Sequence, residues 1–277
     1  MKVLITGAGG QLGCALQTEL AGREVVALTR AELNITELEH VRAAVAAHRP
    51  TVVINCAAYT NVDAAESDEA GAFALNAEGP RNLAVATAEC EIPLVQVSTD
   101  YVFDGTGNRP YLESDPTNPL SVYGRSKLAG EEAVASLNPR HYIARTAWLY
   151  HHEPVSAKNF PKTMLSQSHR ESVRVVNDQH GSPTYAPHLA EAIARLIETE
   201  AFGVYHLAGR GGTSWFELTR RLYQLFGVNA AIEPCTTEEF PRPATRPQYS
   251  VLATSRQPQI LLPSWEEGLE QFAKAMQ

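Results

Sequence analysis

Short apolar runs alternate with amphipathic segments along the first 150 residues. Five runs have the near-continuous hydrophobicity of strands buried on both faces, at residues 2–6, 24–29, 51–57, 93–99 and 141–146. Segments with helical periodicity lie between them, up to residue 20 and at about 36–48, 70–89 and 123–137. The second of these begins with the capping-box pattern Thr36-Glu37-Leu38-Glu39. Buried strands separated by helices predict an α/β fold with a doubly wound parallel sheet.

The order is less regular after residue 150. We expect a loop at 151–160, a short helix, a strand at 172–178, and helices at 187–200 and 214–226. The latter helix has the capping-box pattern Ser214-Trp215-Phe216-Glu217. The proline-rich segment 238–250 should be an irregular, exposed loop, and an amphipathic helix begins near Ser264. We therefore predict a first domain at 1–150 and a smaller lobe at 151–277, which is partly interleaved with the sheet at its carboxyl edge.

Composition and charge exclude several classes of partner. The 277 residues include 44% hydrophobic residues and carry a net charge of −8, so no basic field is available for nucleic acid or an anionic membrane. The longest apolar stretch, at 52–59, is too short to span a bilayer. The four cysteines are scattered without metal-ligand spacing, as in proteins with reduced thiols. We expect a cytoplasmic protein.

Gly7, Gly10 and Gly13 follow the first predicted strand at three-residue spacing. In a Rossmann fold, glycines at this place form the tight turn, let a pyrophosphate approach the backbone and allow the helix to pack closely on the strand. Amides at the start of the following helix would then bind the phosphates. The spacing favours a dinucleotide site, and a plain turn is the alternative.

The end of the second predicted strand bears on the choice of cofactor. An acidic residue that would bind a ribose 2′-hydroxyl is absent from this place, where Thr29 and Arg30 stand instead. An arginine suits the 2′-phosphate of NADP. We therefore expect NADPH, with NADH possible, while a solvated surface arginine is the alternative interpretation.

Tyr123 and Lys127 are the candidate chemical groups. At four-residue spacing on a helix they share one face, and an ammonium beside a phenol lowers the pKa of the phenol. Such a tyrosine can exchange a proton with a substrate oxygen near neutral pH. The spacing alone arises easily by chance. Ser98 and Thr99 at the end of a predicted strand, together with the glycine segment, strengthen the hypothesis.

Eight segments match a known family in their order along nearly the whole chain. They are TGAGGQLG (6–13), NCAAYTNVDAAE (55–66), STDYVFDG (98–105), YGRSKLAGE (123–131), RTAWLY (145–150), NFPKTML (159–165), NDQHGSPT (177–184) and LPSWEEGL (262–269). The chain thereby resembles the dTDP-4-dehydrorhamnose reductases, a family of the extended short-chain dehydrogenase/reductase superfamily. The segments at 98–105 and 177–184 point to this branch. The resemblance implies NADPH-dependent reduction of the C4 ketone of dTDP-4-dehydro-L-rhamnose to dTDP-L-rhamnose, with cofactor on the first domain and the sugar nucleotide on the lobe.

The resemblance also implies roles for individual residues. Thr99 would polarise the ketone in place of the superfamily's serine, and Tyr123 would be the general acid that protonates the C4 alkoxide. Lys127 would bind the nicotinamide ribose and keep Tyr123 acidic. Asp100 and Trp148 match family positions at the sugar, although Trp148 could equally be a core aromatic residue.

Three further groups of residues match the family's cofactor contacts. They would lie at the pyrophosphate, beside the adenine, and along the adenosine and the nicotinamide ribose. The groups are, respectively, Gly7, Gly10, Gln11 and Leu12; Asn34 and Ile35, which stand where the family often has an aspartate and a hydrophobic residue; and Ala58, Tyr59 and Thr60, which Tyr123 and Lys127 complete.

Several polar residues allow two interpretations. Asp63 and Glu66 are expected to be charges at a helix start rather than catalytic acids. Asn159 fits either a nucleotide contact or a helix cap. Arg242 and Arg246 fit either a contact with the diphosphate or a solvated loop.

One departure from the family concerns assembly. Some members have a glutamate two residues beyond the last glycine of the loop, where it serves a magnesium-bridged dimer, and this chain has Ala15 there. We predict no bound metal, and either a monomer or a homodimer. The alternative functions are a different nucleotide-sugar 4-ketoreductase and a non-catalytic NADP-binding regulatory subunit. The presence of Thr99, Tyr123 and Lys127 argues against the latter.

Overall fold

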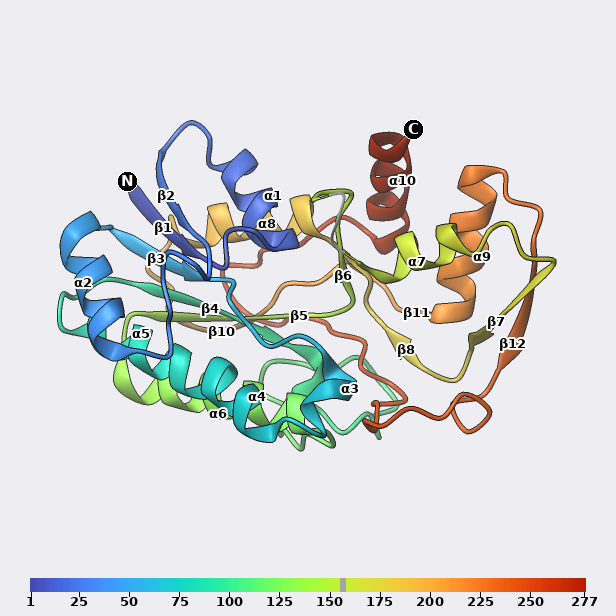
Figure 1. The fold of residues 1–277 in the computed structure, drawn as a ribbon, viewed down its shortest axis with the longest axis horizontal. Coiled ribbons are helices and arrows are strands. Elements are labelled where there is room, and N and C mark those ends of the chain that lie inside the picture. The colour runs from blue at the N-terminus through green and yellow to red at the C-terminus, as the bar shows by residue number, and fades with distance from the viewer. Residues whose placement is uncertain (155–157) are drawn as a thin grey trace.

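A six-stranded parallel sheet forms the centre of the fold (Figure 1). The computed structural model describes residues 1–154 and 158–277. In spatial order the strands are β10 (Gly203–His206), β5 (His141–Thr146), β4 (Leu94–Thr99), β3 (Val52–Asn55), β1 (Lys2–Thr6) and β2 (Glu24–Leu28). The doubly wound α/β prediction is confirmed. The strand order reverses between β1 and β3, which is where sheets of this kind bind ligands at their carboxyl edge.

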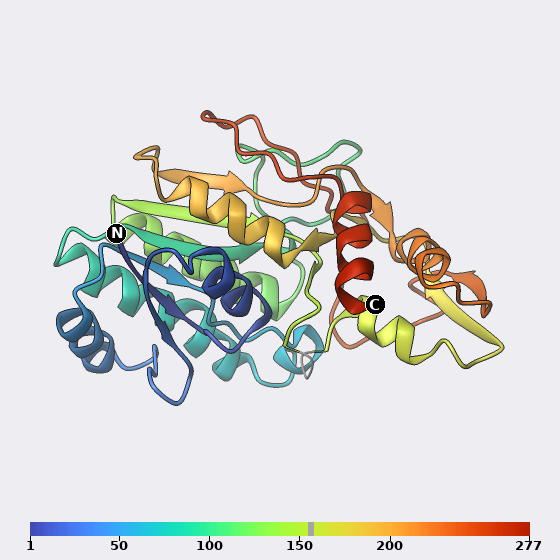
Figure 2. The same cartoon turned by 90° about the horizontal axis from the view of Figure 1, so that it is seen from above.

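Helices cover both faces of the sheet (Figures 1 and 2). One face carries α1 (Gln11–Glu19) and α8 (Ala186–Leu196), and the other carries α2 (Leu38–His48), α5 (Gly79–Ala88) and α6 (Val122–Leu137). Each face has its own core layer, with Leu16 and Ile193 fully buried in one and Val41 and Leu83 in the other. The sheet therefore holds the residues at its carboxyl edge between two packed layers.

The predicted capping box at residue 36 is wrong. Helix α2 begins at Leu38 after Glu37, whose side chain makes no capping bond. Thr36 instead donates from its backbone N–H and its hydroxyl to Oδ1 of Asn34, at 3.2 and 2.9 Å. Thr36 thus lies in an Asx turn before the helix and is not its N-cap residue.

The predicted helix at 70–89 consists of three parts. These are α4 (Glu69–Phe73), a π-helical turn η1 (Ala74–Glu78) and α5, preceded by the short α3 (Val62–Ala65). π-Helical turns are rare and often occur at functional sites. The turn carries Asn76, which is buried.

The smaller lobe lies at the carboxyl edge of the sheet (Figure 1). Its elements are β6 (Leu149–Tyr150), α7 (Phe160–Ser166), β7 (Ser172–Val176), β8 (His180–Gly181), β9 (Thr184–Tyr185), β11 (Thr213–Ser214), α9 (Trp215–Phe226), β12 (Ala231–Cys235) and α10 (Trp265–Met276). The sequence pattern did not predict β10, which joins the main sheet, or β12, which pairs with β7. The domain boundary at residue 150 stays a prediction, since α8 and β10 follow it in sequence but pack in the sheet layers.

Serine side chains cap the first turns of two helices in the lobe. Ser214 accepts a hydrogen bond from the N–H of Glu217 at the start of α9, and Ser264 forms a reciprocal capping box with Glu267 at the start of α10. Residues 155–157 of the predicted loop at 151–160 lie outside the described residues. Within the described part of the chain, no helix is long and apolar enough to cross a membrane.

Candidate active site

The turn after β1 requires glycine at two positions. Gly7 has φ of +65°, and a Cβ added there would lie 2.6 Å from the backbone nitrogen of Ala57. A Cβ at Gly13 would lie 2.6 Å from the carbonyl oxygen of Gly7. Gly10 is exposed at the N-cap of α1. The turn therefore presents open backbone at a helix N-terminus, which fits a pyrophosphate.

Leu12 and Ile35 are core residues, so only their main chains could contact a cofactor. Leu12 is 4% exposed in the layer between the sheet and α1, and Ile35 is 2% exposed in the opposite layer. Ile35 also packs on Gly79, where an added Cβ would lie 2.5 Å from Cδ1 of Ile35. Gln11 is half-buried on α1, and Asn34 is exposed in its Asx turn.

A carboxylate that the sequence pattern did not reveal lies at the end of β2. Glu32 accepts hydrogen bonds from the N–H and the hydroxyl of Thr29, at 2.8 and 2.7 Å. Arg30 is exposed next to this turn. The end of β2, where the sequence predicts a positive charge for the cofactor, therefore carries both Arg30 and Glu32.

Asn76 connects the predicted cofactor loop after β3 to the helix that carries Tyr123. Ala58 and Tyr59 are half-buried in this loop, and Thr60 is exposed. The Asn76 side chain accepts from the N–H of Tyr59 at 2.8 Å, and it donates to the Tyr59 carbonyl and to Oγ of Ser126, both at 3.0 Å. Ser126 in turn donates to the carbonyl of Tyr123 at 2.8 Å.

Thr99, Asp100 and Tyr123 meet at the carboxyl end of β4. The Thr99 hydroxyl donates to Oδ1 of Asp100 at 3.0 Å and accepts from the N–H of Tyr101 at 3.1 Å, at the start of the 3₁₀ turn η2 (Asp100–Val102). Burial raises the pKa of Tyr123 to about 12, a hydrogen bond with Thr99 lowers it, and the charge of Asp100 raises it. The expected lowering of the Tyr123 pKa by Lys127 is thus contradicted.

Lys127 is buried and is hydrogen-bonded to the sheet. Its Nζ donates to the carbonyl oxygen of Val97 on β4 at 2.6 Å, and only 4% of the residue is exposed. Burial lowers the Lys127 pKa to about 8, while the charge of Glu131 raises it. Burial also raises the pKa of the Cys56 thiol to about 12, which leaves this neighbour neutral.

A buried ion pair lies behind these residues. Glu131 on α6 accepts from Arg145 on β5, with Nη2 and Oε2 2.7 Å apart, and both side chains are almost fully buried. Ser98, the residue before Thr99, donates its hydroxyl to the same carboxylate. The pair thereby joins α6 to the strand ends of β4 and β5. Both residues stand in family segments, but their spacing did not reveal the pairing.

The charges at 63 and 66 have tertiary partners that the helix-start interpretation missed. Asp63 accepts from both Arg242 and Arg246, whose Nη2 atoms lie 2.5 and 3.1 Å from Oδ2. Glu66 accepts from the N–H of Val122 at the start of α6, at 2.8 Å. Neither arginine is therefore simply solvated, and the proline-rich segment is anchored to α3.

Trp148 forms part of an aromatic stack in the lobe. Its indole is stacked on that of Trp215, with ring centroids 3.4 Å apart and an interplanar angle of 6°. The backbone of Trp148 has φ of +47°, and a Cβ at Gly181 would lie 2.4 Å from its ring. Packing therefore fixes this indole, whether or not it also contacts a ligand.

Asn159 is a helix cap that also contacts the glycine turn. Its Oδ1 accepts from the N–H of Lys162 at 3.0 Å at the start of α7. Its Nδ2 donates to Oε1 of Gln11 and to the carbonyl of His151, both at 2.8 Å. The lobe is thereby hydrogen-bonded to the predicted pyrophosphate site.

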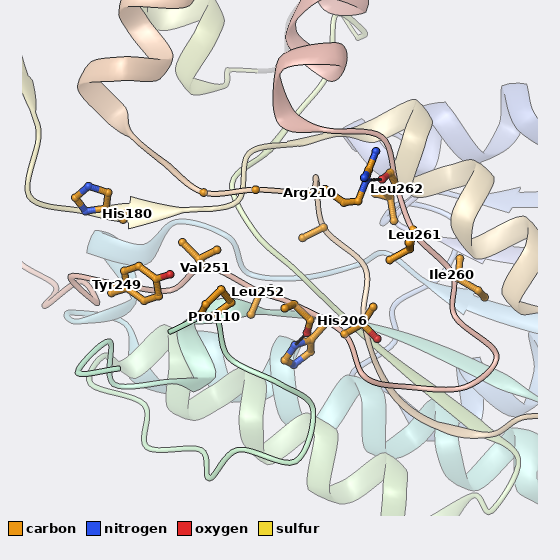
Figure 3. Close-up of a pocket in the computed structure, with 15 residues that line it drawn as sticks. Pro110, His180, His206, Arg210, Tyr249, Val251, Leu252, Ile260, Leu261 and Leu262 are labelled. Atoms are coloured by element: carbon orange, nitrogen blue, oxygen red, sulfur yellow. Dashed lines mark hydrogen bonds between the residues drawn. The ribbon is translucent and has the colours of Figure 1, made fainter. Parts of the chain in front are cut away.

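A cavity of about 420 Å³ lies apart from these groups (Figure 3). Figure 3 shows Tyr249 and Val251 at one end and Ile260 and Leu261 at the other. None of the residues lining it is a predicted site residue. Among the residues that the structure describes, no group of three histidine, cysteine or acidic side chains could hold a metal ion.

Comparison with known proteins gives consistent matches over the chain. A family model described as the RmlD substrate binding domain matches residues 1–277. A dTDP-4-dehydrorhamnose reductase of Streptomyces griseus is 47% identical over 263 residues, which cover 91% of this chain and 86% of that protein. A dTDP-4-keto-6-deoxy-D-glucose reductase of Streptomyces niveus is 43% identical over 254 residues, covering 90% and 87%.

A solved structure extends the likeness to the fold. The crystal structure of dTDP-4-dehydrorhamnose reductase from Bacillus anthracis in complex with NADP is similar with a TM-score of 0.95 and 41% identity. The match covers 99% of this chain and 100% of that one.

Proposed function

Because this chain belongs to the dTDP-4-dehydrorhamnose reductase family, we propose that it reduces the C4 ketone of dTDP-4-dehydro-L-rhamnose to dTDP-L-rhamnose with NADPH. The observation that carries the proposal is the convergence of Thr99, Tyr123 and Lys127 at one edge of the sheet. Cys56 connects this edge to the glycine turn, because it packs against Gly7 and its thiol experiences the charge of Lys127. A cofactor on the turn would thus reach the catalytic groups.

The residues present fit a bound NADPH. The pyrophosphate would lie on the exposed backbone at Gly10 and on the first amides of α1. Arg30 would contact the 2′-phosphate, and the loop from Ala58 to Thr60 would contact the ribose. Bound in this way, NADPH supplies a hydride for C4 of the sugar. The NADP complex of the B. anthracis relative supports this assignment.

Tyr123 transfers the proton. Its raised pKa keeps the phenol protonated at neutral pH, which is the form that a general acid needs. Thr99 orients and polarises the C4 oxygen by hydrogen bonding, and the phenolic proton passes to this oxygen as the C–H bond forms. The transfer is favourable because an alkoxide is a stronger base than a phenolate. The Thr99 hydroxyl then stabilises the phenolate until it takes up a proton from solvent.

The sugar nucleotide would bind between the strand ends and the lobe at 151–277. Trp148, held by Trp215, would form one wall of the sugar site. The S. niveus relative is named for a different 4-keto sugar, so dTDP-4-keto-6-deoxy-D-glucose is the second candidate substrate. Thr99 and Tyr123 would act in the same way on the C4 ketone of either sugar nucleotide.

A direct assay tests the proposal. The purified protein is incubated with NADPH and each of the two 4-keto sugar nucleotides, the nicotinamide absorbance is followed, and the product is identified by NMR. We expect faster turnover of dTDP-4-dehydro-L-rhamnose and formation of dTDP-L-rhamnose. Preference for the other sugar would favour the second candidate, and NADPH binding without turnover of either would favour a regulatory subunit.

A further inference from the structure

Residues 242–250, which we call the strap, cross the carboxyl end of β4. At its start, Arg242 is hydrogen-bonded to Asp63, which also accepts from Arg246. In the middle, Pro247 packs so closely on Gly105 that a Cβ there would lie 2.5 Å from the proline ring. The N–H of Tyr249 donates to the Gly105 carbonyl at 3.2 Å. The strap is therefore fixed against the segment that carries the catalytic strand end.

Ser250 ends the strap and points into this strand end. Its neighbours Tyr249 and Val251 line the cavity of Figure 3, whereas the alternation of an extended chain turns the Ser250 side chain the other way. Its hydroxyl donates to Oδ2 of Asp100 at 2.5 Å, and only 1% of Ser250 is exposed. The backbone N–H of Ser250 donates to the His180 carbonyl at 2.7 Å.

The carboxylate of Asp100 thus accepts one hydroxyl on each oxygen. Ser250 donates to Oδ2, and Thr99 donates to Oδ1 at 3.0 Å. Because Thr99 has a single hydroxyl proton, its bond to Asp100 fixes the place of the hydroxyl group, and the proton has to leave Asp100 when it binds the C4 oxygen. Asp100 is 1% exposed and so has little freedom to turn while Ser250 holds it.

The charge state of Asp100 depends on the same contact. Burial raises the Asp100 pKa to about 6, and the hydrogen bonds from Ser250 and Thr99 lower it. The titratable groups that face it are the phenols of Tyr101 on η2 and Tyr123 on α6, whose pKa values it raises. The strap contacts Asp100 through the Ser250 hydroxyl, which does not titrate.

We propose that Ser250 is a positioning residue of the reductase centre, which acts through Asp100 to fix the position of the Thr99 side chain. The inference rests on the proposed function. Without the Ser250 hydroxyl, Oδ2 of Asp100 is left buried without its donor, and the carboxyl group is free to turn or to take up a proton. Either change weakens the acceptor that holds the Thr99 hydroxyl in place, so the hydroxyl group is less well positioned to bind the C4 oxygen.

The test compares Ser250→Ala with Ser255→Ala. Ser255 lies five residues beyond the end of the strap, is exposed, and bonds to Glu113 instead of the site. We expect Ser250→Ala to lower kcat about ten-fold or more, the equivalent of one hydrogen bond to a charged group. KM for NADPH should change little. Because ionised Asp100 is the acceptor in this proposal, the acid limb of the pH–rate profile should move to higher pH when the bond that lowers the Asp100 pKa is gone.

Each outcome decides the question. A kcat and a pH profile of Ser250→Ala that match those of Ser255→Ala would overturn the proposal. If Ser250→Ala does not fold, Ser250→Cys fills the same space with a weak donor and should show the same shift. If the wild type reduces neither sugar, the proposed function fails, and ¹³C-carboxyl NMR of labelled aspartate still tests Ser250. The Asp100 resonance, assigned with Asp100→Asn, should titrate at higher pH in Ser250→Ala, and equal titration would refute the contact's role.

Discussion

The Nζ of Lys127 donates to the carbonyl oxygen of Val97 at 2.6 Å. The contact places the ammonium on β4, two residues before Thr99, and buries it almost completely. The same burial lowers the Lys127 pKa to about 8 from 10.5. A charge at this place is thus costly to the fold, and its presence is explained by its proposed task at the cofactor ribose.

This cost predicts a pH dependence of stability. Between about pH 8 and 10.5 the unfolded chain binds the Lys127 proton and the folded chain does not, so stability gained from this residue rises with pH across that window. The unfolding free energy of the wild type relative to Lys127→Met should therefore increase by up to about 3 kcal/mol. Urea unfolding at both ends of the window measures it. Lys274→Met, at an exposed site on α10, should show no such trend.

The Asn76 bridge predicts a coupled loss of stability and cofactor binding. Asn76→Ala removes the partners of the Tyr59 backbone and of Ser126, at about 1–3 kcal/mol for each buried group left unpaired. NADPH should bind more weakly, because the loop after β3 is no longer tied to α6. Denaturation and cofactor fluorescence titration measure the two effects.

Asn138→Ala is the matched control for Asn76→Ala. Asn138 is equally buried and donates to Thr87 and to the Ile92 carbonyl, at the opposite end of α6 from Tyr123. Its loss should destabilise the fold but leave the NADPH affinity unchanged. Equal effects of both variants on that affinity would contradict a specific role for Asn76.

The Glu131–Arg145 pair predicts a large effect on stability. Glu131→Gln leaves the buried guanidinium without its counter-charge, and breaking such a pair costs about 3–5 kcal/mol. The neighbouring Glu132 is exposed on the same helix, so Glu132→Gln should be nearly neutral. Chemical denaturation of the two variants measures the difference. Similar stabilities would show that the pair contributes little.

The parts of the fold and of the site that the sequence predicts are those that local residue patterns determine. The five strands follow from continuous apolar runs, and the placement of Tyr123 and Lys127 on one helix follows from their spacing. Thr36 shows how local patterns also fail, because it lies in an Asx turn with Asn34 and the helix begins only after Glu37. The strand β10 was missed because four residues, GVYH, carry too little periodicity.

Such local patterns do not predict contacts between residues that are far apart in the sequence. Ser250 and Asp100 are 150 residues apart in the chain, and Asn76 and Ser126 are 50 apart, so no spacing rule connects them. The pKa of Tyr123 was predicted with the wrong sign for the same reason. Its spacing from Lys127 is visible in the sequence, whereas the burial of the phenol and the Val97 contact of the ammonium are not.

The central claim is that Tyr123 is the proton donor in reduction of the 4-keto sugar nucleotide. Tyr123→Phe removes only the phenolic oxygen, and loss of a general acid typically costs about 10²–10⁴ in rate. Tyr223→Phe is the control, since its hydroxyl donates to the Met164 carbonyl in the lobe. The decisive measurement is kcat of both variants with dTDP-4-dehydro-L-rhamnose, alongside their NADPH affinity. We predict that Tyr123→Phe binds NADPH as the wild type does but loses at least about 100-fold in kcat, and a kcat close to that of Tyr223→Phe would contradict the claim.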